Sequence, residues 1–404
     1  MALVVQKYGG TSVGNLRRIA NVAGRVAKRH DQGDKIAVVV SAMSGETDRL
    51  INLAKDITET PDERELDVLM STGEQVTISL LAMTLRSMDY SSRSYCGWQI
   101  PLVTDDAYGR ARIEDVKKDR ILEDLNQGHI VIVAGFQGVD GQGSITTLGR
   151  GGSDTTAVAV AAALNADVCE IFTDVDGVYT TDPNITSKAR KIGVIAYEEM
   201  LEMASLGAKV LAARSVEYAM RYRVPLMVRS SFNDNEGTLV TKETEEMEKK
   251  PVTAVTCSTK EARVKILGLK DQPGVAAQIF SVLADSGIVV DMIIQNSSDG
   301  GLTDITFTLP EADLSKALAM CEPFKQTLGA TDVQGSNDIA KVSVVGLGMR
   351  SHSGVASKMF WTLAGESINI EMISTSEIKI SCVIRKKYAE LAVRSLHEAF
   401  ELGA

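Results

Sequence analysis

The hydrophobic pattern of the first 235 residues alternates between two kinds of segment. Short apolar runs predict buried strands, and longer stretches with apolar residues at helical spacing predict helices. The strand candidates are 3–6, 36–41, 130–134 and 170–173, and the helix candidates are 17–30, 63–83, 113–127, 155–164 and 203–222. Short apolar strands between helices are typical of a mainly parallel sheet with helices on both faces. Such a sheet binds ligands at the carboxyl ends of its strands.

The stretch from residue 233 to residue 251 breaks this pattern. It reads NDNEGTLVTKETEEMEKKP, so it is polar, highly charged and closed by a proline. Its second half has no apolar periodicity and therefore no face to bury. We expect a first domain of residues 1–235, followed by a linker of residues 236–250.

The remaining residues contain an internal repeat. RVKILGLKDQPGVAAQIFSVLADSGIVVDMI (263–293) aligns with KVSVVGLGMRSHSGVASKMFWTLAGESINIEMI (341–373) after one short insertion. Each copy has the pattern of a strand, a glycine loop, a helix and a second strand, and each is followed by a further strand and helix. This order is that of a ferredoxin-like split βαβ unit, so two such units are expected.

The second copy, taken through its helix at 387–400, has one strand fewer than this order requires. The run 252–257 favours a strand just before the first copy, where it has no obvious partner. We predict that this strand completes the second unit. The first unit (263–335) would then be inserted into a second unit made of 251–262 with 336–404. Pairing of 252–257 with the first unit alone would contradict this topology.

The composition narrows the class of protein. A length of 404 residues, with 44% hydrophobic and 24% charged residues, predicts a globular protein of two or three domains. The formal net charge of −10 argues against nucleic-acid or anionic-membrane binding, because both need a basic surface. The cysteines lie far apart, so a zinc site is not expected. No stretch resembles a signal peptide or a membrane helix, and we expect a soluble, cytoplasmic protein.

Two glycine-rich segments are candidate anion-binding loops. Lys7-Tyr8-Gly9-Gly10-Thr11-Ser12 follows the first strand, and Gly149-Arg150-Gly151-Gly152-Ser153-Asp154 precedes a helix of small residues. Glycines let backbone N–H groups approach an anion, and a helix N-terminus adds its positive dipole. The first segment does not match the GxxxxGK[ST] or GxGxxG pattern. Each has a plain alternative: a strand–helix turn with a solvated lysine for the first, and a surface loop with Asp154 as a helix cap for the second.

Other candidates are weaker when taken singly. Residues 41–47 (SAMSGET) follow a strand, and residues 172–183 (FTDVDGVYTTDP) form a loop that could hold a nucleoside or simply connect two elements. For Glu74 alone, a place on the polar face of its helix is favoured, and for Lys209 alone, a solvated position. The occurrence of two anion-binding loops in one open-sheet domain nevertheless suits group transfer between two anionic substrates.

Taken in order, KYGGTSV, VSAMSGET, STGEQ, GRGGSDTTA and FTDVDGVYTTDP resemble the motifs of the aspartokinases of the amino-acid kinase superfamily. The repeat, with DQPGVAA, VVDMIIQN and ISTSEIKIS, resembles the paired ACT domains of these enzymes. The resemblance implies an α/β fold, in which an open, mainly parallel sheet between helices is joined to two ferredoxin-like βαββαβ domains. It implies a monofunctional aspartate kinase that uses ATP to convert L-aspartate to 4-phospho-L-aspartate. This reaction is the first step of lysine, threonine, methionine and isoleucine biosynthesis, with diaminopimelate on the lysine branch.

The resemblance also implies roles for individual residues. Lys7 would stabilise charge on the transferred phosphoryl group, and Asp154 would organise that cation. The other phosphate or ATP ligands would be Gly9, Gly10, Ser41, Thr173, Asp174, Tyr179, Asp182, Lys209 and Val210. Aspartate would be bound by Thr47, Glu74, Arg150, Gly151, Gly152 and Ser153, with Arg150 on a carboxylate and Glu74 on the ammonium group. Mg²⁺ is expected with ATP, held by phosphates and water rather than by a protein cage.

The repeat would bind feedback effectors, for which lysine and threonine are the candidates. The first effector site would use Asp271, Gly274, Val275, Ala276, Asp291 and Gln295, and the second would use Val355, Ala356, Asn369, Ile370, Ser376 and Glu377. In the family such sites form where ACT units pair across chains, which implies a dimer or tetramer. Met247 opens a segment that could also be translated alone as a regulatory chain.

Two rival interpretations remain at this point. One is an amino-acid kinase that acts on glutamate, a carbamate or a nucleotide, against which the paired sensor units and GRGGSD argue. The other is a non-catalytic amino-acid-binding regulator with the kinase fold, which would lack Lys7 or Asp154, although both are present.

Overall fold

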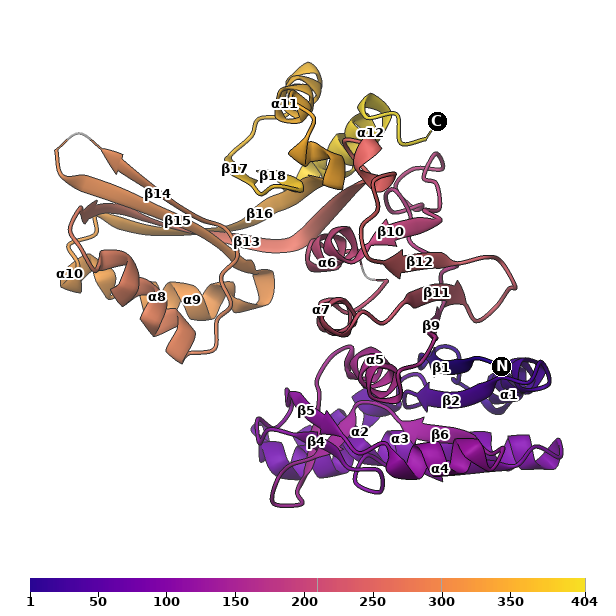
Figure 1. Ribbon diagram of the computed structural model, residues 1–404. Coiled ribbons are helices and arrows are strands. Elements are labelled where there is room, and N and C mark those ends of the chain that lie inside the picture. Colours follow the sequence, from indigo (N-terminus) through magenta and orange to yellow (C-terminus); the bar gives the residue numbers. More distant parts are fainter. Residues whose placement is uncertain (209, 299, 404) are drawn as a thin grey trace. The chain divides into compact units, whose positions relative to one another are not determined.

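The computed structural model describes residues 1–208, 210–298 and 300–403 (Figure 1). The chain forms two compact units. The first consists of Met1–Tyr179, Lys191–Ser205 and Lys209–Met247, and the second consists of Thr180–Arg190, Leu206–Ala208 and Glu248–Ala404. Each unit is described by itself below.

The first unit is built on an eight-stranded sheet with the order β10-β12-β11-β9-β1-β2-β6-β3. Neighbouring strands are parallel except for β11 and β12. The strands are β1 (Leu3–Tyr8), β2 (Lys35–Val40), β3 (Ser92–Tyr95), β6 (Ile130–Ala134), β9 (Val168–Thr173), β10 (Val194–Ala196), β11 (Leu226–Ser230) and β12 (Thr238–Thr241). The four strand candidates are confirmed. The expected linker, in contrast, contains β12, because Thr-Leu-Val-Thr alternates between buried and half-buried positions and pairs with β10 on one side and β11 on the other.

Helices cover both faces of this sheet. They are α1 (Leu16–His30), α2 (Glu46–Ile57), α3 (Glu63–Ser87), α4 (Asp119–Asn126), α5 (Gly152–Leu164), α6 (Tyr197–Ser205) and α7 (Ala213–Tyr222). A core on one face joins apolar residues of α1 and α3 to Tyr8, Val38 and Ile132 of the strands. The helices α4 and α5 pack on the strands as well. By length and composition α3 could cross a membrane, but half of that stretch is buried inside the fold, as in the core helix of a globular protein.

Two helix predictions are wrong in part. The segment 113–127 begins as strand β5 (Ile113–Val116), which pairs with β4 (Leu102–Thr104) before α4 starts. These strands belong to a four-stranded sheet completed by β7 (Gln137–Val139) and β8 (Ile145–Thr147). The segment 203–222 is divided into α6 and α7. Gly207 lies between them with a φ of +105°, which L-residues rarely adopt, so one continuous helix cannot form.

The second unit is built on a six-stranded sheet with the order β14-β15-β13-β16-β18-β17. The strands are β13 (Ala254–Lys270), β14 (Ile293–Ser298), β15 (Leu302–Pro310), β16 (Asp332–Val345), β17 (Met372–Thr375) and β18 (Lys379–Arg385). The helices are α8 (Val275–Asp285), α9 (Leu314–Cys321), α10 (Phe324–Thr327), α11 (Val355–Gly365) and α12 (Ala389–Ala399). Single 3₁₀ turns occur at Met247–Lys249, Glu311–Asp313, Leu347–Arg350 and Lys386–Tyr388.

The long strands β13 and β16 run through both repeats. Residues 254–258 pair with residues 341–345, which belong to the second repeat, and Val255 lies in the core of α11 and α12. Residues 261–266 of β13 pair on their other side with β15 of the first repeat, whose core contains α8 and α9 (Figure 1). Residues 263–267 also pair with residues 332–336 of β16. The predicted pairing of 252–257 with the second repeat is thus confirmed over the residues of β13.

Candidate active site

A buried ion pair joins the first glycine loop to the second. Lys7 is the next-to-last residue of β1, and its Nζ lies 2.5 Å from Oδ1 of Asp154 in the first turn of α5. Both side chains are only 11–12% exposed. An aspartate in the first turn of a helix is also favoured by the helix dipole. The two residues proposed for catalysis therefore meet, although 147 positions separate them in the chain.

The first glycine loop passes close to its neighbours. A Cβ on Gly10 would lie 2.9 Å from the carbonyl oxygen of Ala42, and a Cβ on Gly9 would lie 3.4 Å from Nζ of Lys7. Side chains at these positions would fill the space beside the lysine. The N–H of Gly9 donates to the carbonyl of Phe172 at 3.3 Å. Of the two amides expected to face a phosphate, that of Gly9 is therefore engaged within the protein.

The second glycine loop brings α5 against the end of β6. Gly151, with a φ of +72°, is the N-cap of α5. Just after β6, a Cβ on Gly135 would lie 2.8 Å from both Cβ and Oγ of Ser153, so only glycine admits this approach. Ser153 and Asp154 are buried, whereas Arg150 is exposed to solvent.

Glu74 is buried in α3 and is only 2% exposed, so the interpretation that it lies on a polar helix face is wrong. Its Oε1 accepts a hydrogen bond from the N–H of Ala42 at 3.0 Å, and its Oε2 has no hydrogen-bond partner within the described residues. Burial raises the pKa of this carboxyl to about 7, against the lowering effect of the Ala42 N–H. A cation beside Oε2 would satisfy that oxygen.

Gly73 explains how Glu74 reaches this position. A Cβ on Gly73 would lie 2.9 Å from Cβ of Ala42, so glycine lets α3 approach the segment that follows β2. The predicted residues Ser41 and Thr47 belong to the same segment, before and at the start of α2. Contacts thus run from Glu74 through Ala42 and Gly10 to the loop that carries Lys7.

The nucleotide candidates lie on and after β9, the neighbour of β1. Thr173 donates to Asp174 at 3.1 Å, and the Tyr179 hydroxyl donates to Asp176 at 2.6 Å. This hydrogen bond, together with burial, raises the pKa of Tyr179 to about 12. Asp182 accepts from the N–H and Nδ2 of Asn184 and belongs to the second compact unit. Val210 lies in a turn before α7, and Lys209 lies outside the described residues.

Sequence reasoning missed Asp67, which is fully buried on α3. Its carboxylate accepts from the N–H of Gly109 at 2.9 Å and from the N–H and hydroxyl of Thr147 at 2.7 and 2.6 Å. These bonds tie α3 to the small sheet that leads into the second glycine loop. Burial raises the pKa of Asp67, with these hydrogen bonds opposing the shift. Its spacing could have revealed it, since a residue seven positions before Glu74 lies on the same helix face.

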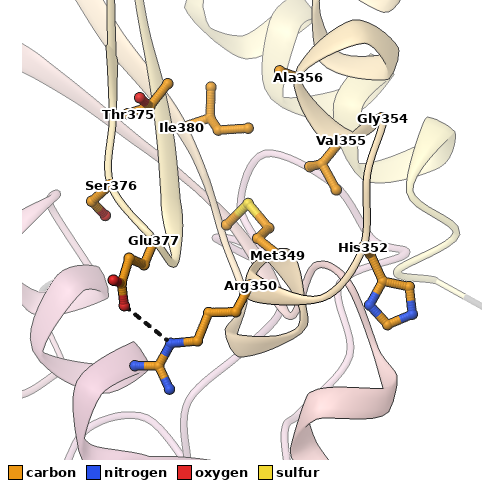
Figure 2. Close-up of a pocket in the computed structure, with 10 residues that line it drawn as sticks. All are labelled: Met349, Arg350, His352, Gly354, Val355, Ala356, Thr375, Ser376, Glu377 and Ile380. Atoms are coloured by element: carbon orange, nitrogen blue, oxygen red, sulfur yellow. Dashed lines mark ion pairs between the residues drawn. The ribbon is translucent and has the colours of Figure 1, made fainter.

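The second unit contains a cavity of about 570 Å³ beside the N-terminus of α11 (Figure 2). It is lined by Met349, Arg350, His352, Gly354, Val355, Ala356, Thr375, Ser376, Glu377 and Ile380. Figure 2 shows Val355 and Ala356 on one side and Ser376 and Glu377 on the turn before β18, with Arg350 paired to Glu377 at 3.5 Å. Four residues of the second predicted effector site therefore share one cavity. Asn369 and Ile370 are not among its lining residues.

The first predicted effector site is built around α8. Gly274, with a φ of +95°, is the N-cap of α8, and Val275 is buried in its first turn. Asp291 precedes β14 and forms an ion pair with Lys341 of the second repeat, while Gln295 is exposed on β14. Within the described residues no cluster of three or more histidine, cysteine or acidic side chains has the arrangement of a metal site.

Comparisons with known proteins agree with this architecture. The model of the amino acid kinase family matches residues 2–230, and that of the ACT domain matches residues 264–322 and 342–400. The chain is 56% identical over 405 residues to an aspartate kinase of Stutzerimonas stutzeri, covering 100% of this chain and 98% of that protein. It is 52% identical over 404 residues to an aspartokinase of Thermus thermophilus, covering 100% and 99%.

A solved structure of Escherichia coli aspartokinase III in complex with aspartate and ADP matches with a TM-score of 0.83 and 28% identity, covering 98% of this chain and 99% of that chain. The same enzyme in complex with lysine and aspartate matches with a TM-score of 0.78. The fold is therefore the amino-acid kinase fold with C-terminal ACT domains. Since the kinase family matches more than half of the chain and full-length relatives exceed 50% identity, the chain is an enzyme that belongs to the aspartokinase family.

Proposed function

We propose that this aspartate kinase transfers the γ-phosphoryl group of ATP to the side-chain carboxylate of L-aspartate, releasing ADP and 4-phospho-L-aspartate. The observation that carries the proposal is the buried Lys7–Asp154 pair between two glycine loops, connected through Ala42 to a buried carboxylate with an open oxygen. The similar Escherichia coli enzyme, solved with aspartate and ADP, supports this choice of substrates.

The nucleophile needs no general base, because a carboxylate is already ionised at neutral pH. Two anions must instead be brought together, so cations and backbone dipoles supply the catalysis. In the proposed reaction Lys7 contacts the transferred phosphoryl group and stabilises the charge that develops on it. Asp154 holds the Lys7 ammonium group beside the phosphoryl group. Gly9 and Gly10 border the same oxygens. The Gly9 amide must first leave the Phe172 carbonyl, to which it donates at 3.3 Å.

Glu74 is proposed to bind the ammonium group of aspartate through Oε2, the oxygen without a partner within the described residues. The ammonium group would replace the missing interaction and keep the carboxyl ionised. Arg150 is exposed, and we propose that it closes on a substrate carboxylate as a planar fork. The other proposed aspartate ligands are Thr47, Gly151, Gly152 and Ser153.

The ATP ligands are proposed at the carboxyl ends of β1, β2 and β9 and in the segments that follow. They are Ser41, Thr173, Asp174, Tyr179, Asp182, Lys209 and Val210, together with the glycine loop. The close approach at Gly10, where a Cβ would meet the Ala42 carbonyl at 2.9 Å, fits a backbone surface for phosphates. Mg²⁺ would enter with ATP and neutralise charge on its phosphates, held mainly by phosphate oxygens and water.

Regulation is proposed to act through the repeat, with lysine and threonine as effectors. The cavity beside α11 offers an amino acid the carboxylate of Glu377, the hydroxyl of Ser376 and a helix N-terminus. The structure of the Escherichia coli enzyme with lysine and aspartate supports lysine as an effector. We propose that the chain self-associates through its ACT domains and that Met247 is an optional start of a regulatory chain. We also propose that the enzyme is cytoplasmic and catalyses the first step of lysine, threonine, methionine and isoleucine synthesis.

The proposed division of the chain places the first ACT domain at 263–335, inserted into a second ACT domain made of 251–262 and 336–404. Pairing of residues 254–258 with 341–345 supports this arrangement. The catalytic domain must extend past residue 235 to include β12, which ends at Thr241.

The decisive experiment is an ADP-release assay of the full chain with aspartate, glutamate, a carbamate or a nucleotide as acceptor. We expect turnover with aspartate and a product that hydroxylamine traps as a hydroxamate, since acyl phosphates react with this nucleophile. A preference for glutamate, or no turnover with any acceptor, would refute the assignment.

The effectors are tested in the same assay, with lysine and threonine added separately and together. Glu377→Gln should weaken inhibition, whereas the control Glu366→Gln, exposed outside the cavity, should not.

A further inference from the structure

A buried pair of serine hydroxyls connects distant segments of the first unit. Ser12 is the last residue of the KYGGTS segment, and Ser231 directly follows β11. The Ser12 hydroxyl donates to Oγ of Ser231 at 2.8 Å, and the residues are 2% and 8% exposed. Neither residue belongs to the proposed sets of ATP or aspartate ligands.

The direction of these hydrogen bonds is fixed by the number of protons. Ser231 donates both its N–H, at 2.9 Å, and its hydroxyl, at 3.2 Å, to the carbonyl oxygen of Thr173. A hydroxyl has one proton and two lone pairs, so Ser231 can then only accept from Ser12. The result is a one-way relay from Ser12 through Ser231 to Thr173 at the end of β9.

The same relay holds the glycine loop. The N–H of Ser12 donates to the carbonyl of Gly9 at 2.9 Å, which closes the turn containing Gly9 and Gly10. Among the described residues, the one direct hydrogen bond from this turn to β9 is the 3.3 Å contact from Gly9 to Phe172, near the long limit for N–H···O bonds. That bond must break if the Gly9 amide is to face a phosphate, and the serine relay would then still hold the turn against β9.

We propose that Ser12 and Ser231 are positioning residues for phosphoryl transfer, which set the distance between the glycine loop and the nucleotide residues Thr173 and Asp174. This inference rests on the proposed function, because it assigns these two segments to one nucleotide. The serines act through Gly9, Gly10 and Thr173 and do not touch the substrates. Small errors in such positions reduce rates strongly, with about 10²-fold lost for a misplacement of about 1 Å.

The test compares Ser12→Ala, Ser231→Ala and the double variant in steady-state kinetics of the full chain. Each single variant should lower kcat/KM for ATP by about tenfold and leave the KM for aspartate nearly unchanged. Ser231→Ala should have the larger effect, because it removes a donor to Thr173 and leaves the Ser12 hydroxyl without an acceptor. The double variant should be no worse than Ser231→Ala alone, since both residues belong to one relay. Ser231→Thr, which keeps the hydroxyl, should restore most of the activity.

The chain offers a matched control in the second unit. The hydroxyls of Ser343 and Ser381 lie 2.7 Å apart, and both residues are at most 1% exposed. Ser343→Ala should lower the melting temperature about as much as Ser12→Ala without changing kcat/KM for ATP. Equal kinetic losses in Ser343→Ala and Ser12→Ala, or additive losses in the double variant, would overturn the proposal.

ATP affinity measured by calorimetry separates this inference from the proposed function, because binding needs no acceptor. If the unmodified enzyme binds ATP but does not phosphorylate aspartate, the proposed function fails, and weaker ATP binding by Ser231→Ala would still support the relay. If aspartate is phosphorylated normally and both serine variants keep the full ATP affinity and turnover, the relay alone is refuted.

Discussion

The candidate active site and the junction between the two repeats both bury charged side chains, but they treat these charges differently. In the active site Glu74 is 2% exposed, and its Oε2 lacks a partner within the described residues. At the junction the Lys341 side chain is 4% exposed, and its ammonium contacts the carboxylates of Asp291 and Glu261. Burial alone would lower the pKa of Lys341, but these two partners outweigh it and raise the pKa.

The junction charges follow the symmetry of the repeat. The alignment places Arg263 opposite Lys341 and Asp291 opposite Glu371. Arg263 pairs with Glu371, and Lys341 pairs with Asp291, so the cation of each repeat binds the acid of the other. Met292 and Met372, also equivalent in the repeat, pack together beside these pairs. The junction is thus neutralised from within, whereas Glu74 in the candidate active site keeps one carboxylate oxygen without a partner in the described part of the chain. This difference is the one expected between the charges proposed to bind substrates and the charges that hold the fold.

The largest effect is expected from Lys7→Ala. Removing the cation that is proposed to contact the transferred phosphoryl group should lower kcat by about 10³-fold, with little change in the KM for aspartate. Steady-state kinetics at saturating ATP measure both constants. Lys341→Met serves as the control, because it removes a lysine that is also buried, but at the junction, and it should leave kcat unchanged in the absence of effectors. An unchanged kcat in Lys7→Ala would show that the active-site pair is only structural.

Glu74→Gln should act on binding rather than on turnover. The amide keeps the shape of the side chain but cannot pair with the substrate ammonium group, so the KM for aspartate should rise about 30-fold, consistent with an unpaired charged group in the pocket. The kcat at saturating aspartate should fall much less. Since the buried carboxylate is unsatisfied without substrate, the melting temperature should stay equal or increase. A large decrease in the melting temperature would show that Glu74 stabilises the fold, as the junction charges do.

Lys341→Met should have the opposite effects to Glu74→Gln: it should lower the stability of the fold and leave the kinetic constants unchanged. The substitution leaves Asp291 and Glu261 without their shared cation, which should lower the free energy of unfolding by about 2 kcal/mol, less than for a fully buried pair because Asp291 is half exposed. Arg263→Met should lower the free energy of unfolding less, because within the described residues Arg263 forms an ion pair with Glu371 alone. Denaturant unfolding of the full chain measures both. If the two variants lose the same free energy of unfolding, or lose none, the second carboxylate that contacts Lys341 does not stabilise the fold.

The features that could be predicted from the sequence are those that depend on the local pattern of apolar and polar residues. The four buried strands were found because β-branched runs fit a covered sheet, and the pairing of β13 with β16 followed from the strand missing in the second repeat. The segment 113–127 was misassigned because its apolar spacing fits a helix, while pairing with β4 made its first residues a strand. The expected roles of the site residues came from the motif resemblance, and they await the experiments above.

The burial of individual charges could not be predicted in this way. Apolar residues occur on nearly every side of α3, so its pattern does not show which face turns inward. For Glu74 taken alone, the pattern favours the polar face, which is wrong. Its burial depends on the contact of Gly73 with Ala42, two residues in different elements. The crossed ion pairs likewise require the register of β13 against β16, which no single repeat specifies.

The smallest predicted effect uses the titration of Glu74. Burial raises its pKa to about 7, so the carboxyl becomes neutral as the pH falls through that value and loses its attraction for the substrate ammonium group. Between pH 8 and pH 6 the ionised fraction falls about tenfold, and the KM for aspartate should rise by the same factor. The measurement requires saturating ATP, because the nucleotide phosphates titrate in the same range.

Two variants serve as controls for this pH dependence. Glu74→Gln has no group to titrate at this position, so its KM for aspartate should not change with pH. Lys341→Met should keep the pH dependence of the unmodified enzyme. A flat profile in the unmodified enzyme would mean that Glu74 is ionised throughout, and its open oxygen would then need another cation from the protein.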